Sequence, residues 1–107
     1  MNAMQGAQGD MAPRSGTFTA SDAGWRYTGA LTFDDAAKVL EASSALALPD
    51  TGVVDMSGLE HADSTALAVV MALKRRAAAE GRTLAIEGMP KSLHSLAVAY
   101  GVEDLLA

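Results

Sequence analysis

The spacing of hydrophobic and polar positions changes along the chain and predicts the order of its elements. Short segments rich in Thr and aromatic residues lie at 17–20 and 25–29, with a turn-prone stretch between them. This pattern is typical of two strands joined as a hairpin. Apolar residues then recur at helical spacing after Thr32, which stands where a helix N-cap is expected, and predict a helix over about residues 33–46.

A strand and a helix then follow one another in the middle of the chain. Residues 53–56 form a compact apolar segment that predicts a strand with Asp55 at its carboxyl end, and residues 57–62 are expected to form a loop. The strongest helix signal begins at Asp63, where an Asp-Ser-Thr cluster can cap free backbone amides, and it stops at Gly81.

The last part of the chain repeats this strand and helix order. Residues 83–87 predict another strand, Pro90 is expected to begin a third helix, and Gly101 ends it. Residues 102–106 are expected to form a short final turn that packs back on the domain.

This order of elements predicts an α/β fold with a single domain over residues 17–107. We expect a mixed sheet of about four strands with three to four helices, since strand–helix–strand units give parallel neighbours and the hairpin adds an antiparallel pair. Residues 1–16 lack any period and are predicted to be a disordered N-terminal arm.

Composition narrows the classes of function. Alanine accounts for 22 of the 107 residues, so the hydrophobic fraction of 50% overstates the core. The formal net charge of −5 excludes a global basic footprint for nucleic acid or an anionic membrane. Cysteine is absent, which excludes disulfides and thiolate metal sites. The longest apolar run, Ala66 to Leu73, is too short to span a bilayer, and no secretory signal is recognisable, so a cytoplasmic location is expected.

Candidate chemistry gathers around Ser64 but does not complete a catalytic motif. His61, Asp55 and Asp63 lie near this serine in sequence. A nucleophile elbow needs glycine two residues before and after the serine, and these positions hold alanine. No phosphate-binding glycine motif is present, and His61 with Asp63 offers two metal ligands without a partner motif. We therefore expect no enzyme activity, no cofactor and no metal.

The helix after Asp63 is apolar on all sides over residues 66–73, unlike an ordinary surface helix. At about 100° per residue, Ala68 and Ala72 lie nearly opposite the side formed by Ala66, Val70 and Leu73. This pattern predicts either a docking surface or a helix buried on both sides. Ser64 likewise has two interpretations, and a capping role is the more common one for serine at a helix start.

The stretch VVDMSGLEHADSTAL, residues 53–67, resembles the signature of STAS domains, the family of anti-anti-sigma factors and sulfate-transporter tails. It departs from that signature at Ala66, where the family has glycine, and at Ala62, where a larger apolar residue is usual. Residues 29–33, 80–82 and 93–106 also look like the family, so the resemblance covers about residues 17–106.

Within the family, the chain looks most like the MlaB-like STAS subunits of Mla phospholipid ABC transporters of Gram-negative bacteria. That resemblance implies binding to the MlaF-like ATPase subunit of a membrane transporter complex, and a role in its assembly or activity in lipid transport that maintains outer-membrane asymmetry. The location implied is cytoplasmic and peripheral to the inner membrane through the partner. The alternative is an anti-anti-sigma factor that is phosphorylated at Ser64 and binds a kinase-type anti-sigma factor.

Both interpretations place the functional site on the same residues. We expect a docking surface that combines residues 57–65 with the outer side of the second helix, with Ser64 at its centre. An exposed hydroxyl beside small side chains gives close approach and one directional polar contact. The predicted partner-binding or regulatory residues are Ser64, Asp63, Thr65, Ala68, Ala72, Asp55 and His61.

Overall fold

A four-stranded mixed sheet organises residues 16–106, which the computed structural model describes. The strands lie in chain order and are β1 (Thr17–Ser21), β2 (Gly24–Leu31), β3 (Val53–Ala62) and β4 (Ala85–Glu87). β1 pairs antiparallel with β2, whereas β2–β3 and β3–β4 are parallel. The predicted α/β class and mixed sheet are therefore confirmed. The arm predicted over residues 1–16 lies outside the described residues except for Gly16.

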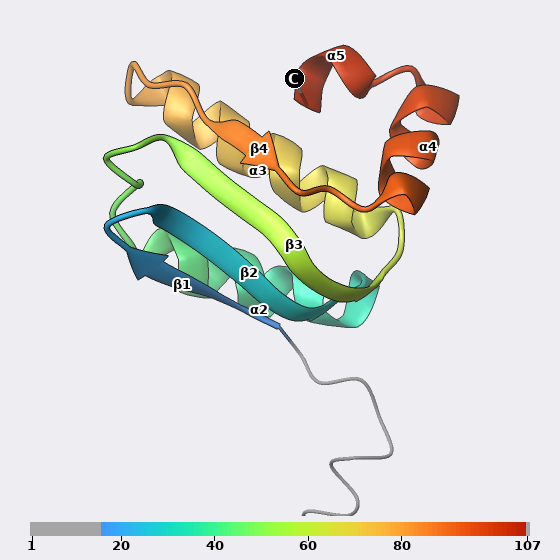
Figure 1. The fold of residues 1–107 in the computed structure, drawn as a ribbon, viewed down its shortest axis with the longest axis horizontal. Helices are drawn as coiled ribbons and strands as arrows, with labels where there is room; N and C mark the ends of the chain where they lie inside the picture. Colours follow the sequence, from blue (N-terminus) through green and yellow to red (C-terminus); the bar gives the residue numbers. More distant parts are fainter. Residues whose placement is uncertain (1–15, 107) are drawn as a thin grey trace, which may run out of the picture.

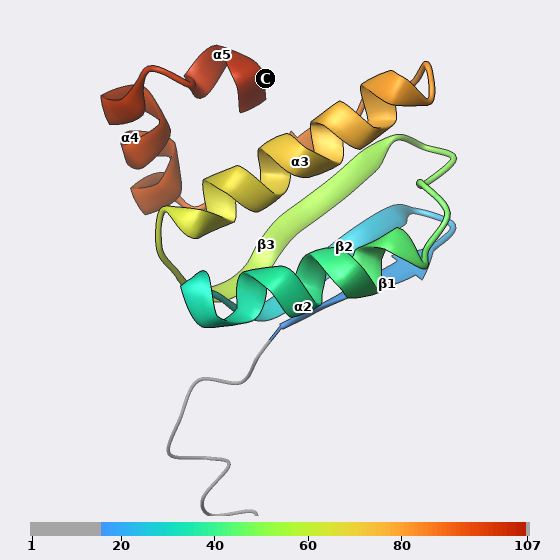
Figure 2. The ribbon, with the colours of Figure 1, turned by 180° about the vertical axis from the view of Figure 1, so that it is seen from behind.

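The helices cover one face of this sheet. They are α2 (Phe33–Ser44), α3 (Thr65–Ala79), α4 (Lys91–Tyr100) and α5 (Glu103–Leu106). Figure 1 shows the sheet in front of α2 and α3, and Figure 2 shows these two helices side by side from behind, with α4 and α5 beyond α3. The opposite face of the sheet carries exposed polar side chains such as Arg26, Thr28 and Ser57. One face of the sheet is thus packed and the other is solvated.

The core lies between the sheet and the two long helices. Trp25 and Tyr27 of β2, Met56 of β3 and Leu73 of α3 are almost wholly buried. Burial, with a smaller contribution from the charge of Asp35, raises the pKa of Tyr27 to about 12, so its hydroxyl keeps its proton and donates a hydrogen bond to the Ala30 carbonyl at 2.5 Å. Three of the five aromatic residues, Phe18, Trp25 and Tyr27, therefore lie in the core, whereas Phe33 and Tyr100 are exposed.

The predicted boundaries are correct at most helix ends and wrong in the middle of the chain. Residues 57–62, predicted as a loop, continue β3 to Ala62. The register with β2 shifts twice, between Arg26 and Thr28 and again between Gly29 and Leu31, so β3 places extra residues against its partner. A Cβ at Gly58 would lie 2.5 Å from the Tyr27 carbonyl oxygen, which explains glycine at this close approach. These bulges break the alternation that would have marked a strand.

Smaller differences concern the ends of other elements. α2 ends at Ser44 rather than at 46, β4 begins at Ala85 rather than at 83, and Pro90 occupies the N-cap position before α4. Gly101 ends α4 in the left-handed conformation, with φ of 72°, as the sequence predicted. The short turn expected after it is α5, which lies against α3 and α4.

Three side chains hold residues 43–49, which comprise the end of α2 and the segment that follows it. Arg76 of α3 donates hydrogen bonds to the carbonyls of Ser43 and Leu46, at 3.0 and 2.7 Å, and lies 5.9 Å from the Trp25 ring centroid. The Trp25 indole donates to the Ala47 carbonyl at 3.1 Å. Arg82 donates to the carbonyls of Leu48 and Pro49. These donors bind carbonyls in the last turn of α2 and in the segment after it, and they join α2, α3 and the sheet.

Replacing Arg76 by methionine should therefore destabilise the domain. The variant keeps much of the aliphatic packing but leaves the Ser43 and Leu46 carbonyls without this donor, at a cost of about 1–3 kcal/mol. Urea unfolding followed by circular dichroism measures the change. Arg75→Met, at the exposed neighbouring position, is the matched control and should change the free energy of unfolding by less than about 0.5 kcal/mol. Equal stability of the two variants would contradict this role for Arg76.

Candidate partner-binding site

One carboxylate joins the N-termini of α2 and α3. Asp63 follows β3 directly, and its Oδ1 accepts a hydrogen bond from the Thr65 amide at 2.9 Å. Its Oδ2 accepts one from the Phe33 amide at 3.0 Å, thirty residues away along the chain. A carboxylate near a helix N-terminus is also favoured by the helix dipole. Asp63 thus fixes the two helix starts relative to each other.

These contacts set the ionisation of Asp63. Partial burial by itself raises its pKa, but hydrogen bonds from the Phe33 amide and from the side chain and amide of Thr65 outweigh that effect. The pKa of Asp63 consequently lies below its ordinary value. The side chain is charged at neutral pH and adds a fixed negative charge to this end of the molecule.

Asp63, rather than Ser64, performs the capping at the start of α3. Ser64 has φ of −62° and ψ of −17°, which is already helical, and its side chain makes no capping hydrogen bond. The Asp63 carboxylate instead binds the amide two residues later, in the manner of an N-cap. Ser64 is exposed. Its hydroxyl is therefore available to a partner, and the capping explanation for this serine is wrong.

The outer side of α3 continues from Ser64 in helical steps. Ala68, one turn later, is exposed, and so is Arg75 further along the same side. Ala72 is only half-buried because it lies toward α2, one turn before the Arg76 side chain that reaches the end of α2. The helix α3 is thus neither exposed on all sides nor buried on both sides. Its exposed strip is narrow and lined by small side chains in its first half.

His61 lies at the same end of the sheet as Ser64, and Asp55 does not. His61 is exposed near the end of β3, where Ala62 pairs with Leu31 of β2. Within the described residues, no hydrogen bond joins the His61 ring to the Ser64 hydroxyl. Asp55, predicted at the carboxyl end of its strand, is instead the third residue of β3. Asp63 comes eight positions later along the chain, about 25 Å away at the usual rise of a strand.

Asp55 belongs to a separate charged group on the uncovered face of the sheet. It lies 3.9 Å from Arg26, measured from Oδ2 to Nη1, and is paired in register with Glu87 of β4. Hydrogen bonds from the amide and hydroxyl of Ser57, reinforced by the nearby Arg26 charge, hold the pKa of Asp55 below its ordinary value despite partial desolvation. The extended strand therefore removes Asp55 from the predicted site.

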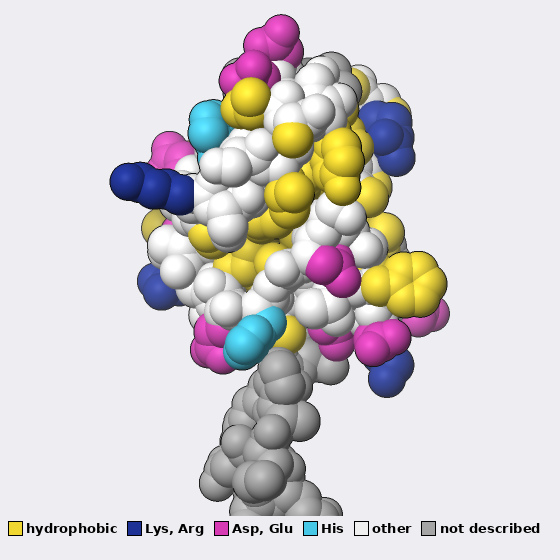
Figure 3. Space-filling view, turned by 90° about the vertical axis from the view of Figure 1, so that its right-hand side faces the viewer, with side chains coloured by type: hydrophobic (Ala, Val, Ile, Leu, Met, Phe, Trp, Pro, Cys, Tyr) yellow, Lys and Arg dark blue, Asp and Glu magenta, His cyan; other side chains and the backbone are white. Residues whose placement is uncertain are grey.

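The structure adds a residue that the sequence analysis missed. Phe33, the first residue of α2, is 78% exposed, and the Asp63 hydrogen bond to its backbone places it beside the start of α3. The available signal was its position between the capping residue Thr32 and two aspartates, although helical spacing places Phe33 on the same side as Leu40. Figure 3 shows hydrophobic side chains gathered across the middle of this end of the molecule, with acidic side chains among them.

The other half of the α3 surface is basic. A shallow hollow of about 310 Å³ is lined by Met71, Lys74, Arg75 and Ala78. Partial burial lowers the pKa of Lys74, whereas Arg75 is exposed. Acidic residues therefore lie near the N-terminal end of α3 and basic ones toward its C-terminal end. A partner bound along α3 would therefore contact negative charge at one end of the helix and positive charge at the other.

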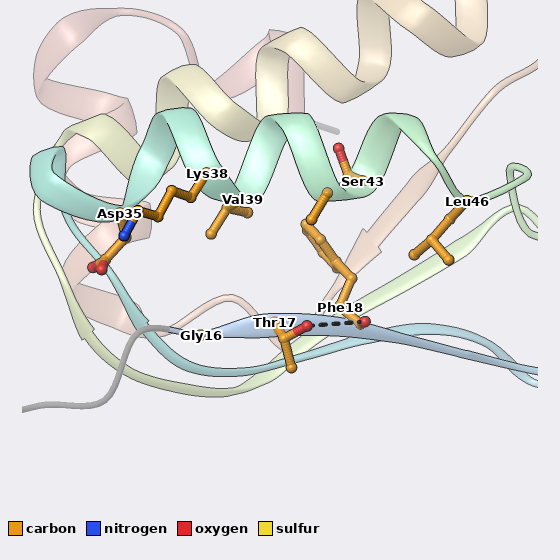
Figure 4. A pocket seen from close by; sticks show the side chains of 9 residues that line it. Gly16, Thr17, Phe18, Asp35, Lys38, Val39, Ser43 and Leu46 are labelled. Carbon is orange, nitrogen blue, oxygen red and sulfur yellow. Dashed lines mark hydrogen bonds between the residues drawn. The ribbon is translucent and has the colours of Figure 1, made fainter. Parts of the chain in front are cut away.

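A larger groove lies elsewhere, between β1 and α2. Its volume is about 370 Å³, and Figure 4 shows Phe18, Val39 and Leu46 lining it together with polar groups at one end. The carboxylate there, Asp35, already accepts hydrogen bonds from the amide and hydroxyl of Thr32 at the start of α2. The groove therefore offers an apolar wall without a set of reactive side chains.

Among residues 16–106, no group of three or more His, Asp or Glu side chains is placed to hold a metal ion. None of the helices in the same range has both the length and the apolar character needed to cross a membrane.

The arrangement defines a class of protein. It is a small α/β domain whose strand–helix junction presents a hydroxyl and a strip of small side chains on α3 to the outside. A family model described as "Mlab, STAS domain" matches residues 18–107. The chain belongs to the STAS domain family, whose members are generally non-catalytic. The search of curated proteins found no match.

Replacing Asp63 by alanine should weaken the fold, because the amides of Thr65 and Phe33 lose their acceptor. Loss of a helix cap costs about 0.5–2 kcal/mol. Since the pKa of Asp63 is lowered by folding, its charge-dependent contribution is present above the ordinary aspartate pKa of about 4 and is lost as the pH falls through the folded value. Urea unfolding at pH 7 and at pH 3 should show the difference from the parent shrinking in acid.

Ser64→Ala is the matched control for that experiment. It removes a neighbouring polar side chain that makes no capping hydrogen bond, so the free energy of unfolding should change by less than about 0.5 kcal/mol. If Ser64→Ala lowers the free energy of unfolding more than Asp63→Ala does, Ser64 and not Asp63 is the capping residue.

Proposed function

We propose that this STAS domain is a non-catalytic adaptor that binds the MlaF-like ATPase subunit of a phospholipid ABC transporter. In this role it supports the assembly or activity of a transporter that maintains outer-membrane lipid asymmetry. The domain would lie in the cytoplasm and reach the inner membrane through its partner. The observation that carries the proposal is the exposed Ser64 hydroxyl, which is not used in capping, at the head of the small-residue strip of α3.

This surface has the composition of an interface core. Ala68 lets a partner backbone approach α3 closely, and Ser64 supplies a directional hydrogen bond at the same place. The fixed charge of Asp63 on one side and the cation Arg75 on the other favour one orientation of the partner over the reverse. His61 and Thr65 border the same end of the helix, and Ala72 lies at its edge toward α2.

The choice of an ATPase partner rests on the agreement between the family match and the C-terminal sequence. The matched family description carries the Mlab name. The chain also ends in the pattern L-x-x-L-x-x-x-Y-G-V-x-x-L-L over residues 93–106, which resembles the transporter subunits.

An anti-anti-sigma role is the second candidate, and the same serine favours it. A phosphate on Ser64 would face solvent at a helix N-terminus, a position that accepts anions. It would also add about two negative charges beside the ionised Asp63, which would repel an acidic partner surface. Under this alternative, the partner is a kinase-type anti-sigma factor.

Binding measurements separate the two candidates. The purified domain is titrated with the ATPase subunit and, in parallel, with a kinase-type anti-sigma factor encoded in the same genome, each followed by calorimetry. Saturable binding to the ATPase alone is the expected result. Binding to the anti-sigma factor alone, with phosphorylation of Ser64 in the presence of ATP, would replace the transporter proposal by its alternative.

Substitutions on α3 test the location of the surface. Ser64→Asp and Ala68→Arg should each weaken ATPase binding at least tenfold, because the first places a carboxylate against the partner and the second blocks close approach. Ala99→Arg, at an exposed alanine on α4, is the matched control and should bind like the parent. All three variants should unfold within about 1 kcal/mol of the parent, since the changed positions are exposed. Unchanged binding by both α3 variants would show that the surface is elsewhere.

A further inference from the structure

Phe33 is an aromatic residue whose backbone is held by a hydrogen bond and whose ring the fold does not cover. It is 78% exposed, the largest exposed fraction among the large hydrophobic side chains of the described residues, ahead of Tyr100 at 60% and Val98 at 47%. An isolated exposed hydrophobic residue is ordinary in itself. The position of Phe33 in the molecule distinguishes it.

The backbone of Phe33 is fixed on both sides. Its amide donates to Asp63 Oδ2, which also belongs to the structure that begins α3. The preceding residue, Thr32, donates from its amide to Asp35 Oδ2 at 3.1 Å, which closes the first turn of α2. An aromatic ring on such a backbone has only two side-chain torsions to fix, so ordering it against a partner has a small entropic cost.

Exposed acidic residues lie around this ring. Asp34 is the next residue of α2 and is exposed, and Asp63 is charged and in contact with the Phe33 amide. Glu60 is exposed near the end of β3, which lies at the same end of the sheet because Leu31 pairs with Ala62. Of the exposed cations, Arg75 belongs to the other half of α3, and Lys38 of α2 lies beside Asp35 in the groove between β1 and α2. Phe33 is therefore an apolar point within an acidic rim.

We propose that Phe33 is the anchor of the docking surface formed by Ser64 and Ala68 at the start of α3, and that it inserts into an apolar cleft bordered by Lys or Arg side chains on the partner protein. The inference rests on the proposed adaptor function and names the chemistry that the ATPase must present at this end of α3. Charge complementarity selects this occupant: the acidic rim attracts a basic protein surface and repels both an anionic membrane and the same rim on a second copy. Aromatic residues in such a position supply much of the energy of an interface.

Calorimetric titration of the full chain with the purified ATPase subunit tests the anchor. Phe33→Ala should weaken binding at least tenfold, and Phe33→Leu should fall between this variant and the parent. Tyr100→Ala removes the second most exposed large hydrophobic side chain, on α4, and is the matched control that should bind like the parent. Thermal unfolding should be unchanged in all three, because each position is exposed.

The basic border is tested by the salt dependence of association. The double variant Asp34→Asn/Glu60→Gln should associate more slowly than the parent at low ionic strength, and its rate should depend less steeply on salt. An unchanged rate and salt dependence would overturn the charged part of the proposal.

The outcomes distinguish the anchor from the function on which it rests. If the parent chain binds the ATPase subunit and Phe33→Ala binds it with equal affinity, the anchor is overturned and the adaptor function stays intact. Absence of binding by the parent chain overturns both. Self-association of the parent that Phe33→Ala abolishes, or Phe33-dependent flotation with vesicles of anionic phospholipid, would assign the ring to another occupant and overturn the proposal.

Discussion

The hydrogen bonds of the Asp63 carboxylate are the constraint on which the candidate site depends. One oxygen holds the first amide of α2 and the other holds an amide in the first turn of α3, so two helices whose first residues are 32 positions apart begin at one point. Because Asp63 supplies the cap, the neighbouring hydroxyl of Ser64 is left to solvent, and because Phe33 is held by its backbone, its ring is directed away from the core. Exposure at both residues is therefore a consequence of the fold and not of a loose segment.

A second set of contacts holds the far ends of the same helices. Arg76 of α3 binds one carbonyl in the last turn of α2 and one just after the helix, while Trp25 and Arg82 bind the next ones along the chain. With both ends of the pair tied, α3 has little freedom to turn about its axis, and the strip through Ser64 and Ala68 keeps one direction. A surface fixed in this way needs little reorganisation on binding. Less of the free energy of its contacts is therefore offset by the cost of ordering.

The sequence predicts the local features of this fold, but it does not predict features that depend on the pairing of strands distant in sequence. The cap at Thr32, the stop at Gly101 and the order of strands and helices all follow from signals within a few residues, and the structure confirms them. The continuation of β3 through residues 57–62 depends on its bulged register with β2, which no local pattern carries, and the misplacement of Asp55 follows from that error. Whether Asp63 or Ser64 caps α3 likewise depends on the backbone dihedral angles of these residues, and the sequence is compatible with either residue as the cap.

Ala66, where the family signature has glycine, shows how the site tolerates a change in its motif. This residue is wholly buried, and among the described residues only glycines have positive φ, so the backbone there does not require glycine. What the position requires is a side chain small enough for α3 to approach the sheet, and a methyl group meets that requirement within the core. Since Ala66 lies on the opposite side of the helix from Ser64 and Ala68, the substitution fills packing space without touching the outer strip. The departure from the signature therefore concerns the packing of the helix and leaves the exposed chemistry of its N-terminus unchanged.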